Sequence, residues 1–306
     1  MSFKIESQLS ENQIESDVAS YLGYLTPIWS KRFRLISVDE QTTGADKLFN
    51  RFLPIYLQFK VSHGLNPTAA ILPRVLNKPL ARIIGYRNSN NLSGNPVLYF
   101  QLRKKANTAI DFQHNILHKM NLPPMQYGLY VAPLTLDMQE YEKLLDRAWY
   151  FRFYPIDPFI HRQMEIHDTT LQKKLVLGSN PFLRNHIAIP PHEIVTTHEH
   201  HYSFSKSGGD VAWHSGELLN DDFRLSTQLA RIFNSFYYNR DLGLPLDQFV
   251  RYIRDFRFDR YRRIDDDSES LNDPYLLVSR FGKLLKTEFN IRLMILTEAE
   301  GNRKDL

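Results

Sequence analysis

Apolar residues recur at helical spacing near the start of the chain and alternate with polar residues soon afterwards. Residues 10–23 carry an apolar stripe with a period of about 3.6, and Ser10 is placed to cap its first turn, which predicts an amphipathic helix. Residues 31–38 and 55–61 alternate, as is typical of β-strands, and a shorter strand is predicted at 45–49. The order helix, strand, strand, strand indicates an α/β fold class.

The same patterns continue through the rest of the chain. They predict a turn at 50–54 and strands at 97–102, 127–132, 194–204 and 291–296. They predict helices at 107–120, 137–148, 218–237, 246–261 and 275–289, with Asp137 able to cap the second of these. Because prolines gather between residues 155 and 191, we expect an α/β core over residues 1–155 and an additional C-terminal α+β region over residues 156–306. One continuous domain is the alternative.

Composition indicates an ordinary globular protein. Of 306 residues, 42% are hydrophobic and 24% are charged, which is enough apolar material for a core. There is no cysteine, which excludes disulfides, thiolate metal ligands and cysteine nucleophiles. The first residues are polar, and no apolar run reaches the roughly 18 residues of a membrane helix, so we expect a cytoplasmic protein with no membrane partner. The net charge of +4 weakly indicates a polyanionic partner.

A group of side chains in the first 60 residues has the chemistry of a metal-dependent phosphodiesterase. Gln58 and Lys60 lie two apart on one predicted strand and therefore share a face. Asp46 begins the preceding strand, and a hairpin would bring its carboxylate near Lys60. Glu11 and Glu15 share a face of the first helix, and either is able to reach the same place. Carboxylate and amide oxygens suit Mg²⁺ or Mn²⁺, and a lysine orients the attacking water.

The segments SENQIESDVASYL, TGAD and YLQFKVS resemble the PD-(D/E)xK nuclease superfamily, in a variant with the pattern Glu…GxD…QxK. The resemblance implies a restriction-endonuclease-like mixed central sheet flanked by helices and an endonuclease that hydrolyses DNA. It implies Asp46, Glu15 and Gln58 as ligands of Mg²⁺ or Mn²⁺ and Lys60 as the catalytic lysine, with Gln58 standing where the family usually has Glu or Asp. Glu15 is preferred to Glu11 for its spacing from the apolar positions that follow. A restriction or phage-defence setting, with a homodimer or a partner protein, is suggested by the same likeness.

Two alternatives stay open. A Gly-Ala-Asp turn is common, and Gln58 and Lys60 on the solvent face of an edge strand would be an ordinary consequence of alternation. The missing carboxylate at Gln58 also allows an inactive nuclease-fold protein that binds nucleic acid or serves as a scaffold. Nucleotide binding and serine hydrolysis have no support, because the chain has no P-loop, GxGxxG or GxSxG motif.

Two later clusters are further candidates for binding. The first contains His192, His198, His200 and His201. On a strand His198 and His200 would share a face and suit a transition metal, although polar surface residues explain the cluster equally well. The second is the segment 249–263, where arginines alternate with aromatic residues. Such a segment can contact phosphates and stack on bases, and the predicted nucleic-acid contacts are Arg251, Arg254, Arg257, Arg260 and Arg263. Its alternative is an amphipathic helix with Arg–Asp pairs outside.

Overall fold

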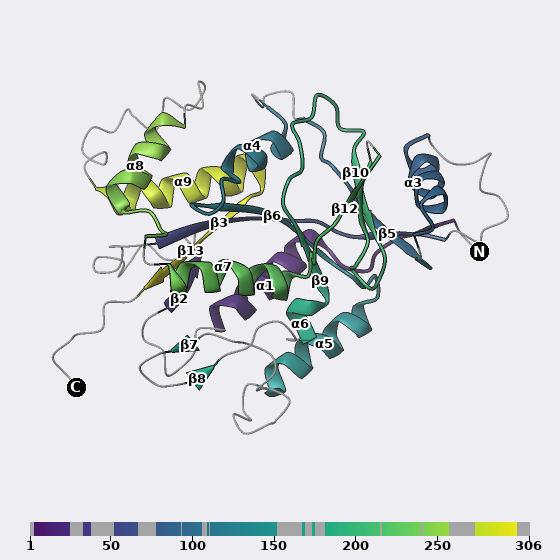
Figure 1. The fold of residues 1–306 in the computed structure, drawn as a ribbon, viewed down its shortest axis with the longest axis horizontal. Coiled ribbons are helices and arrows are strands. Elements are labelled where there is room, and N and C mark those ends of the chain that lie inside the picture. Colours follow the sequence, from purple (N-terminus) through teal and green to yellow (C-terminus); the bar gives the residue numbers. More distant parts are fainter. Residues whose placement is uncertain are drawn as a thin grey trace. The chain divides into compact units, whose positions relative to one another are not determined.

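The structure is a computed structural model of the 306 residues. It describes residues 3–24, 33–37, 52–66, 78–92, 94–105, 109, 111–151, 167–168, 173–174, 181–214, 216–239, 241–256 and 273–298. These residues form a mixed α/β protein with two larger sheets and several helices, which confirms the predicted class (Figure 1). In the described ranges no helix is both long and apolar enough to cross a membrane.

The chain divides into two compact units, and each is assembled from segments that are distant in the sequence. Unit 1 comprises Met1–Glu15, Phe59–Lys104 and Tyr130–Asn234, and unit 2 comprises Ser16–Gln58, Lys105–Leu129 and Ser235–Leu306. The chain crosses between the units five times. Four crossings lie within the elements α1 (Glu11–Tyr24), β3 (Phe52–Phe59), β6 (Tyr127–Pro133) and α7 (Leu225–Tyr238), and one lies between Lys104 and Lys105. The boundary expected near residue 155 falls inside unit 1.

A six-stranded antiparallel sheet is the main element of unit 1. Its strand order is β1-β4-β5-β10-β11-β12. The strands are β1 (Lys4–Ile5), β4 (His63–Leu65), β5 (Val97–Gln101), β10 (His201–Phe204), β11 (Val211–Trp213) and β12 (Glu217–Leu219). Tyr99 of β5 lies opposite His63 on one side and opposite Ser203 on the other, which defines the register of the central strands.

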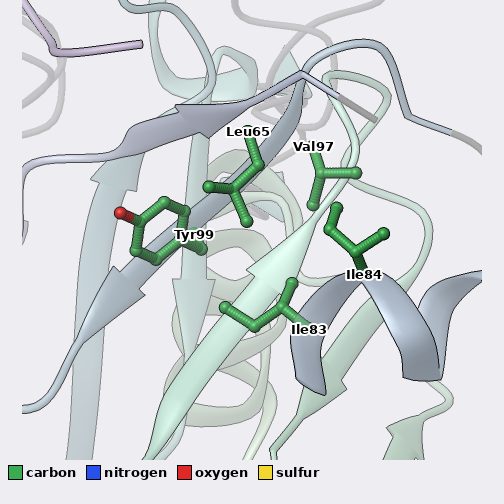
Figure 2. Close-up of a cluster of buried hydrophobic side chains, with 5 residues drawn as sticks. All are labelled: Leu65, Ile83, Ile84, Val97 and Tyr99. Atoms are coloured by element: carbon green, nitrogen blue, oxygen red, sulfur yellow. The ribbon is translucent and has the colours of Figure 1, made fainter. Parts of the chain in front are cut away.

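Helix α3 (Lys78–Ser89) packs against one face of this sheet. Figure 2 shows Ile83 and Ile84 of α3 beside Leu65 of β4 and Val97 and Tyr99 of β5. All five side chains are buried. Because successive strand residues point to opposite faces, Leu98 and Phe100 point away from this cluster. The apolar contact with α3 therefore holds β5 from one side.

The opposite face of the sheet is packed with aromatic side chains. The ring centroids of Phe100 and Tyr202 are 5.2 Å apart, and those of Tyr202 and Trp213 are 4.5 Å apart. Tyr130 of β6 joins them at 5.8 Å from Tyr202. Tilted aromatic pairs at these separations bury large apolar areas on rigid side chains. Strand β5 is consequently fixed from both faces.

Unit 1 also contains a second pair of strands, two packed helices and a short ribbon. Within unit 1 β6 pairs antiparallel with β9 (His186–Ile189), from Tyr130 opposite Ile189 to Pro133 opposite His186. Helices α5 (Met138–Phe151) and α6 (Pro181–Arg184) pack on each other, and a two-stranded ribbon joins β7 (His167–Asp168) to β8 (Lys173–Lys174). The Asp137 carboxylate accepts a hydrogen bond of 2.8 Å from the Glu140 amide, which confirms the predicted cap.

Unit 2 is built on a three-stranded antiparallel arrangement. Strand β13 (Arg292–Glu298) lies between β2 (Phe33–Ser37) and β3. Helix α9 (Pro274–Phe289) packs on β13, and α8 (Leu246–Asp255) packs on α9 through Phe249 and Phe281, whose ring centroids are 6.3 Å apart (Figure 1). Helix α4 (Gln113–Met120) also belongs to unit 2.

Several element predictions need correction. The predicted turn at 50–54 is wrong at its end, because Pro54 lies within β3 opposite Ile295. The predicted helix at 107–120 begins only at Gln113, where the Asp111 carboxylate accepts from the Phe112 amide at 2.8 Å. Of the predicted strand at 194–204 only β10 forms, and residues 218–219, at the start of the predicted helix at 218–237, belong to β12 instead. The strand expected at 45–49 lies outside the described residues.

Candidate functional site

Lys60 lies buried directly after β3, in unit 1. Its amide donates to the Val131 carbonyl of β6 at 2.8 Å, so its backbone is fixed by sheet-like pairing. The residue is 4% exposed. The Nζ atom is 3.8 Å from Oε1 of Glu11, whose side chain is 35% exposed. The structure therefore brings together a strand lysine and a helix glutamate, as predicted, and the glutamate that reaches Lys60 is Glu11.

Burial and charge act in opposite directions on Lys60. Desolvation is the main cause that lowers the pKa of its ammonium group, and the nearby charge of Arg103 lowers it further. Glu11 raises the pKa of Lys60 through its charge and its hydrogen bond. A lysine in this setting is a partly desolvated cation held beside one carboxylate.

Glu15 and Gln58 are also buried. Glu15 follows Glu11 by one helical turn on α1 and is 4% exposed. Gln58 is the last residue of unit 2 on β3, where it is 0% exposed. Among the described residues, neither atom of its side-chain amide has a hydrogen-bond partner. A buried side-chain amide without hydrogen bonds lowers the stability of the folded protein. Binding of a ligand to the amide would offset this loss.

The solvent-face alternative for Gln58 and Lys60 is wrong. All eight residues of β3 are buried, so this strand has no solvent face. With exposed fractions of 0% and 4%, neither side chain is an ordinary surface residue of an edge strand. The alternation along residues 55–61 correctly predicts a strand. It does not separate a buried face from an exposed face, because every residue of β3 is buried.

The remaining predicted ligand, Asp46, lies outside the described residues. Within those residues no three or more histidines, aspartates or glutamates are grouped so that they could hold a metal ion. The oxygen donors Glu11, Glu15 and Gln58 have the hard character that Mg²⁺ and Mn²⁺ prefer. The described donor set fits such an ion in its chemistry, and the assignment of Asp46 stays a prediction.

The histidine cluster does not have the predicted strand geometry. Residues 190–200 form no strand, so His198 and His200 do not share a strand face. His192 pairs instead with Glu217, with Nε2 2.7 Å from the carboxylate, and His200 stacks on Trp213 at 5.0 Å between centroids. Burial lowers the pKa of His201 to about 4. These contacts lie within unit 1. The polar-surface alternative is not confirmed, because His201 is 2% exposed and His192, His198 and His200 are partly buried.

The arginine–aromatic segment is described only in part. Arg251 and Arg254 lie on α8, and both are exposed. Arg251 pairs with Asp247 one turn earlier at 2.8 Å, which is the Arg–Asp pairing of the structural alternative. Arg257, Arg260 and Arg263 lie outside the described residues, so their role in nucleic-acid contact stays a prediction.

Two residues near Lys60 were missed in the sequence. His63 follows Lys60 by three positions, and its Nδ1 is 2.9 Å from Oε2 of Glu6. Burial is the main cause that lowers the pKa of His63, while Glu6 and Glu11 raise it. Arg103 acts on the charge of Lys60 from the end of β5, forty-three positions away in the chain. No local motif marks either residue, and the proximity of Arg103 to Lys60 depends on the pairing of β4 with β5.

A buried Ser–His pair elsewhere in unit 1 is structural. Nε2 of His214 lies 2.8 Å from Oγ of Ser203, a distance that is also typical of a nucleophile and its base. Ser203 is 0% exposed and also accepts from Arg87 at 3.4 Å, and Arg87 forms an ion pair with Asp210. Desolvation lowers the pKa of His214 to about 3. A fully buried hydroxyl that already has two hydrogen-bond partners is not accessible to a substrate.

Comparison with protein-family models, with curated proteins and with solved structures gave no match for this chain.

Proposed function

We propose that this protein is a metal-dependent nuclease that hydrolyses phosphodiester bonds of DNA. The observation that carries the proposal is Lys60, a buried lysine held 3.8 Å from the carboxylate of Glu11. Burying a lysine costs stability, and residues that break the rules of core packing are expected mainly at functional sites. The pair links the first helix to the residue that follows β3, and this supports a site shared by a helix glutamate and the lysine of the QxK segment.

Each side chain has a distinct role in this proposal. Lys60 orients the attacking water and offsets the negative charge that develops on the phosphate. Glu11 favours the protonated form of Lys60 and positions its side chain. Asp46, Glu15 and Gln58 would supply oxygen atoms to Mg²⁺ or Mn²⁺. The side-chain amide of Gln58, which has no hydrogen-bond partner among the described residues, supports this use. When bound, the ion would supply Lewis acidity for the water and the phosphate.

Cleavage assays test the proposal directly. Supercoiled plasmid and single-stranded DNA are incubated with purified protein and Mg²⁺ or Mn²⁺, and with EDTA as the metal-free control. We expect metal-dependent cutting that falls by about 10²–10³-fold in Asp46→Asn and in Glu11→Gln, because each removes charge from the reacting centre. Glu142→Gln, at an exposed position on α5, is the matched control. Absence of cutting by the wild type, or full activity in both variants, would contradict the proposal.

A second candidate is a nuclease-fold protein that binds nucleic acid without cutting it. The observation in its favour is Gln58, which brings no negative charge to a position where the resembled family has a carboxylate. Calorimetric titration with Mn²⁺ separates the two candidates. A nuclease should bind the ion measurably and lose binding in Asp46→Asn, whereas a non-catalytic protein should show no binding that depends on Asp46.

A further inference from the structure

Two exposed cations follow β5 directly. Arg103 and Lys104 both lie on the surface of unit 1, and Lys105 continues the run in the sequence. Within the described part of the chain neither Arg103 nor Lys104 forms an ion pair with a carboxylate. Arg251 on α8 differs, because Asp247 already neutralises it. Adjacent unpaired cations are the groups that a polyanion can neutralise without first breaking an ion pair.

The backbone that carries these cations is firmly held. Leu102, immediately before Arg103, is 3% exposed, and its amide donates to the His200 carbonyl at 3.1 Å. Strand β5 pairs with β4 and β10, and Val97 and Tyr99 lie in the cluster under α3 (Figure 2). Arg103 and Lys104 are thus presented from a fixed strand end, which lowers the entropy that binding would cost.

Arg103 also lies near Lys60. The positive charge of Arg103 opposes protonation of Lys60, so the two groups lie within electrostatic reach of each other. Lys104 follows Arg103 directly in the chain, and both residues are exposed. Two adjacent exposed cations attract a chain of phosphates.

We propose that Arg103 and Lys104 bind neighbouring phosphates of a nucleic-acid backbone and hold the strand beside Lys60. The delivery of a phosphodiester to Lys60 rests on the proposed nuclease function, but the binding itself does not. Arg103 and Lys104 belong to unit 1, whereas the arginines of α8 belong to unit 2.

Salt-dependent DNA binding tests this surface. The dissociation constant of a short fluorescent DNA duplex is measured at several salt concentrations in EDTA, where no metal-dependent cutting occurs. Each lost phosphate contact lowers the slope of log affinity against log salt by about 1, so Arg103→Ala/Lys104→Ala should lower it by about 2 and weaken binding about tenfold or more at low salt.

Two further variants control for charge and folding. Lys143→Ala/Lys206→Ala removes the same charge from unit 1 at exposed positions, and Lys206 there already pairs with Glu140 at 3.5 Å. We expect this double variant to keep both slope and affinity near those of the wild type. Arg103→Lys/Lys104→Arg keeps the charges and should bind like the wild type, which shows that the loss in the alanine variant is not a folding defect.

The outcomes separate this inference from the nuclease proposal. If DNA binding depends on Arg103 and Lys104 but the wild type does not cut DNA, the result supports this inference and contradicts the nuclease proposal. Equal losses in the alanine variant and the Lys143/Lys206 control overturn it, because binding would then reflect net charge alone. No DNA binding by the wild type, or binding of polyglutamate as strong as that of DNA, overturns it as well.

Discussion

At the scale of single residues, Lys60 and Glu11 form an unequal pair. Lys60 is 4% exposed, whereas the Glu11 side chain is 35% exposed and able to keep part of its hydration. Removing one partner of a buried ion pair lowers the stability of the protein when the other partner stays charged and shielded from solvent. Replacing the buried partner with an apolar side chain often leaves stability unchanged or raises it. The two halves of this pair should therefore respond differently to substitution.

We predict that Lys60→Met leaves the free energy of unfolding unchanged or raises it by about 1 kcal/mol, because an apolar chain of similar length replaces a desolvated charge. Glu11→Gln should lower it by about 1–2 kcal/mol, because Lys60 then stays buried without its carboxylate. Urea unfolding at pH 7 measures both. Lys119→Met, at an exposed lysine paired with Asp111, is the control and should change little. A larger loss in Lys60→Met than in Glu11→Gln would contradict this account.

His186 adds a pH dependence to stability. It is 0% exposed, with Nδ1 2.8 Å from the Phe182 carbonyl, and burial lowers its pKa to about 4. Between pH 6.5 and 4 the unfolded chain therefore binds a proton at this residue that the folded chain does not. Stability contributed by the neutral ring is complete above pH 6.5 and is lost as the pH falls towards 4.

We predict that the free energy of unfolding falls between pH 6.5 and 4, with up to about 3 kcal/mol of the decrease due to His186. His186→Phe, which fits the aromatic neighbours Tyr141 and Phe182, should make this decrease smaller. His118→Gln, at a partly exposed position on α4, should leave it unchanged. Parallel pH profiles of wild type and His186→Phe would show that His186 is protonated equally in both states.

At the scale of elements, the sequence predicted a helix and its first residue correctly where a capping residue precedes an apolar stripe. Ser10 accepts from the Gln13 amide at 3.2 Å and α1 begins at Glu11, and Asp137 caps α5 in the same way. Local signals failed where pairing with a distant strand decides the structure. Pro54 favours a turn by itself, yet it lies in β3 opposite Ile295 because β13 and β3 pair along their length.

Two glycines in different elements should respond in opposite ways to alanine. Gly85 is exposed within α3, and an added Cβ would meet no atom within 4 Å, so Gly85→Ala should stabilise the protein by about 0.5–1 kcal/mol through helix propensity. A Cβ at Gly128 of β6 would lie 2.8 Å from the Leu117 carbonyl oxygen, so Gly128→Ala should destabilise by about 1–3 kcal/mol. Thermal unfolding compares the pair, and equal effects at the two positions would contradict these contacts.

At the scale of the whole molecule, the two units interleave along the chain. Three separate segments enter each unit, and four of the five divisions fall inside α1, β3, β6 and α7. A boundary drawn from a cluster of prolines assumes that each domain is continuous in sequence. Unit 1 instead combines the first residues of the chain with two later segments, which begin at Phe59 and Tyr130. Local composition does not mark the points where the chain crosses from one unit to the other.

The candidate site was predictable only where its residues share one helix or one strand. The helix glutamates and the QFK strand were recognisable, because spacing within one helix or strand decides which residues share a face. The burial of Lys60 and the proximity of Arg103 were not, since both depend on pairings between distant strands. The choice between Glu11 and Glu15 required the position of α1 relative to Lys60 within unit 1.

The most direct test of the central claim is the rate of Mg²⁺-dependent plasmid cleavage by Lys60→Met beside Lys143→Met. Lys143 is an exposed lysine of α5 and serves as the matched control. We predict a loss of about 10²–10³-fold in Lys60→Met, with DNA affinity retained, and no loss in Lys143→Met. Cleavage by Lys60→Met at the wild-type rate would contradict the account, because the buried lysine would then have no part in the chemistry.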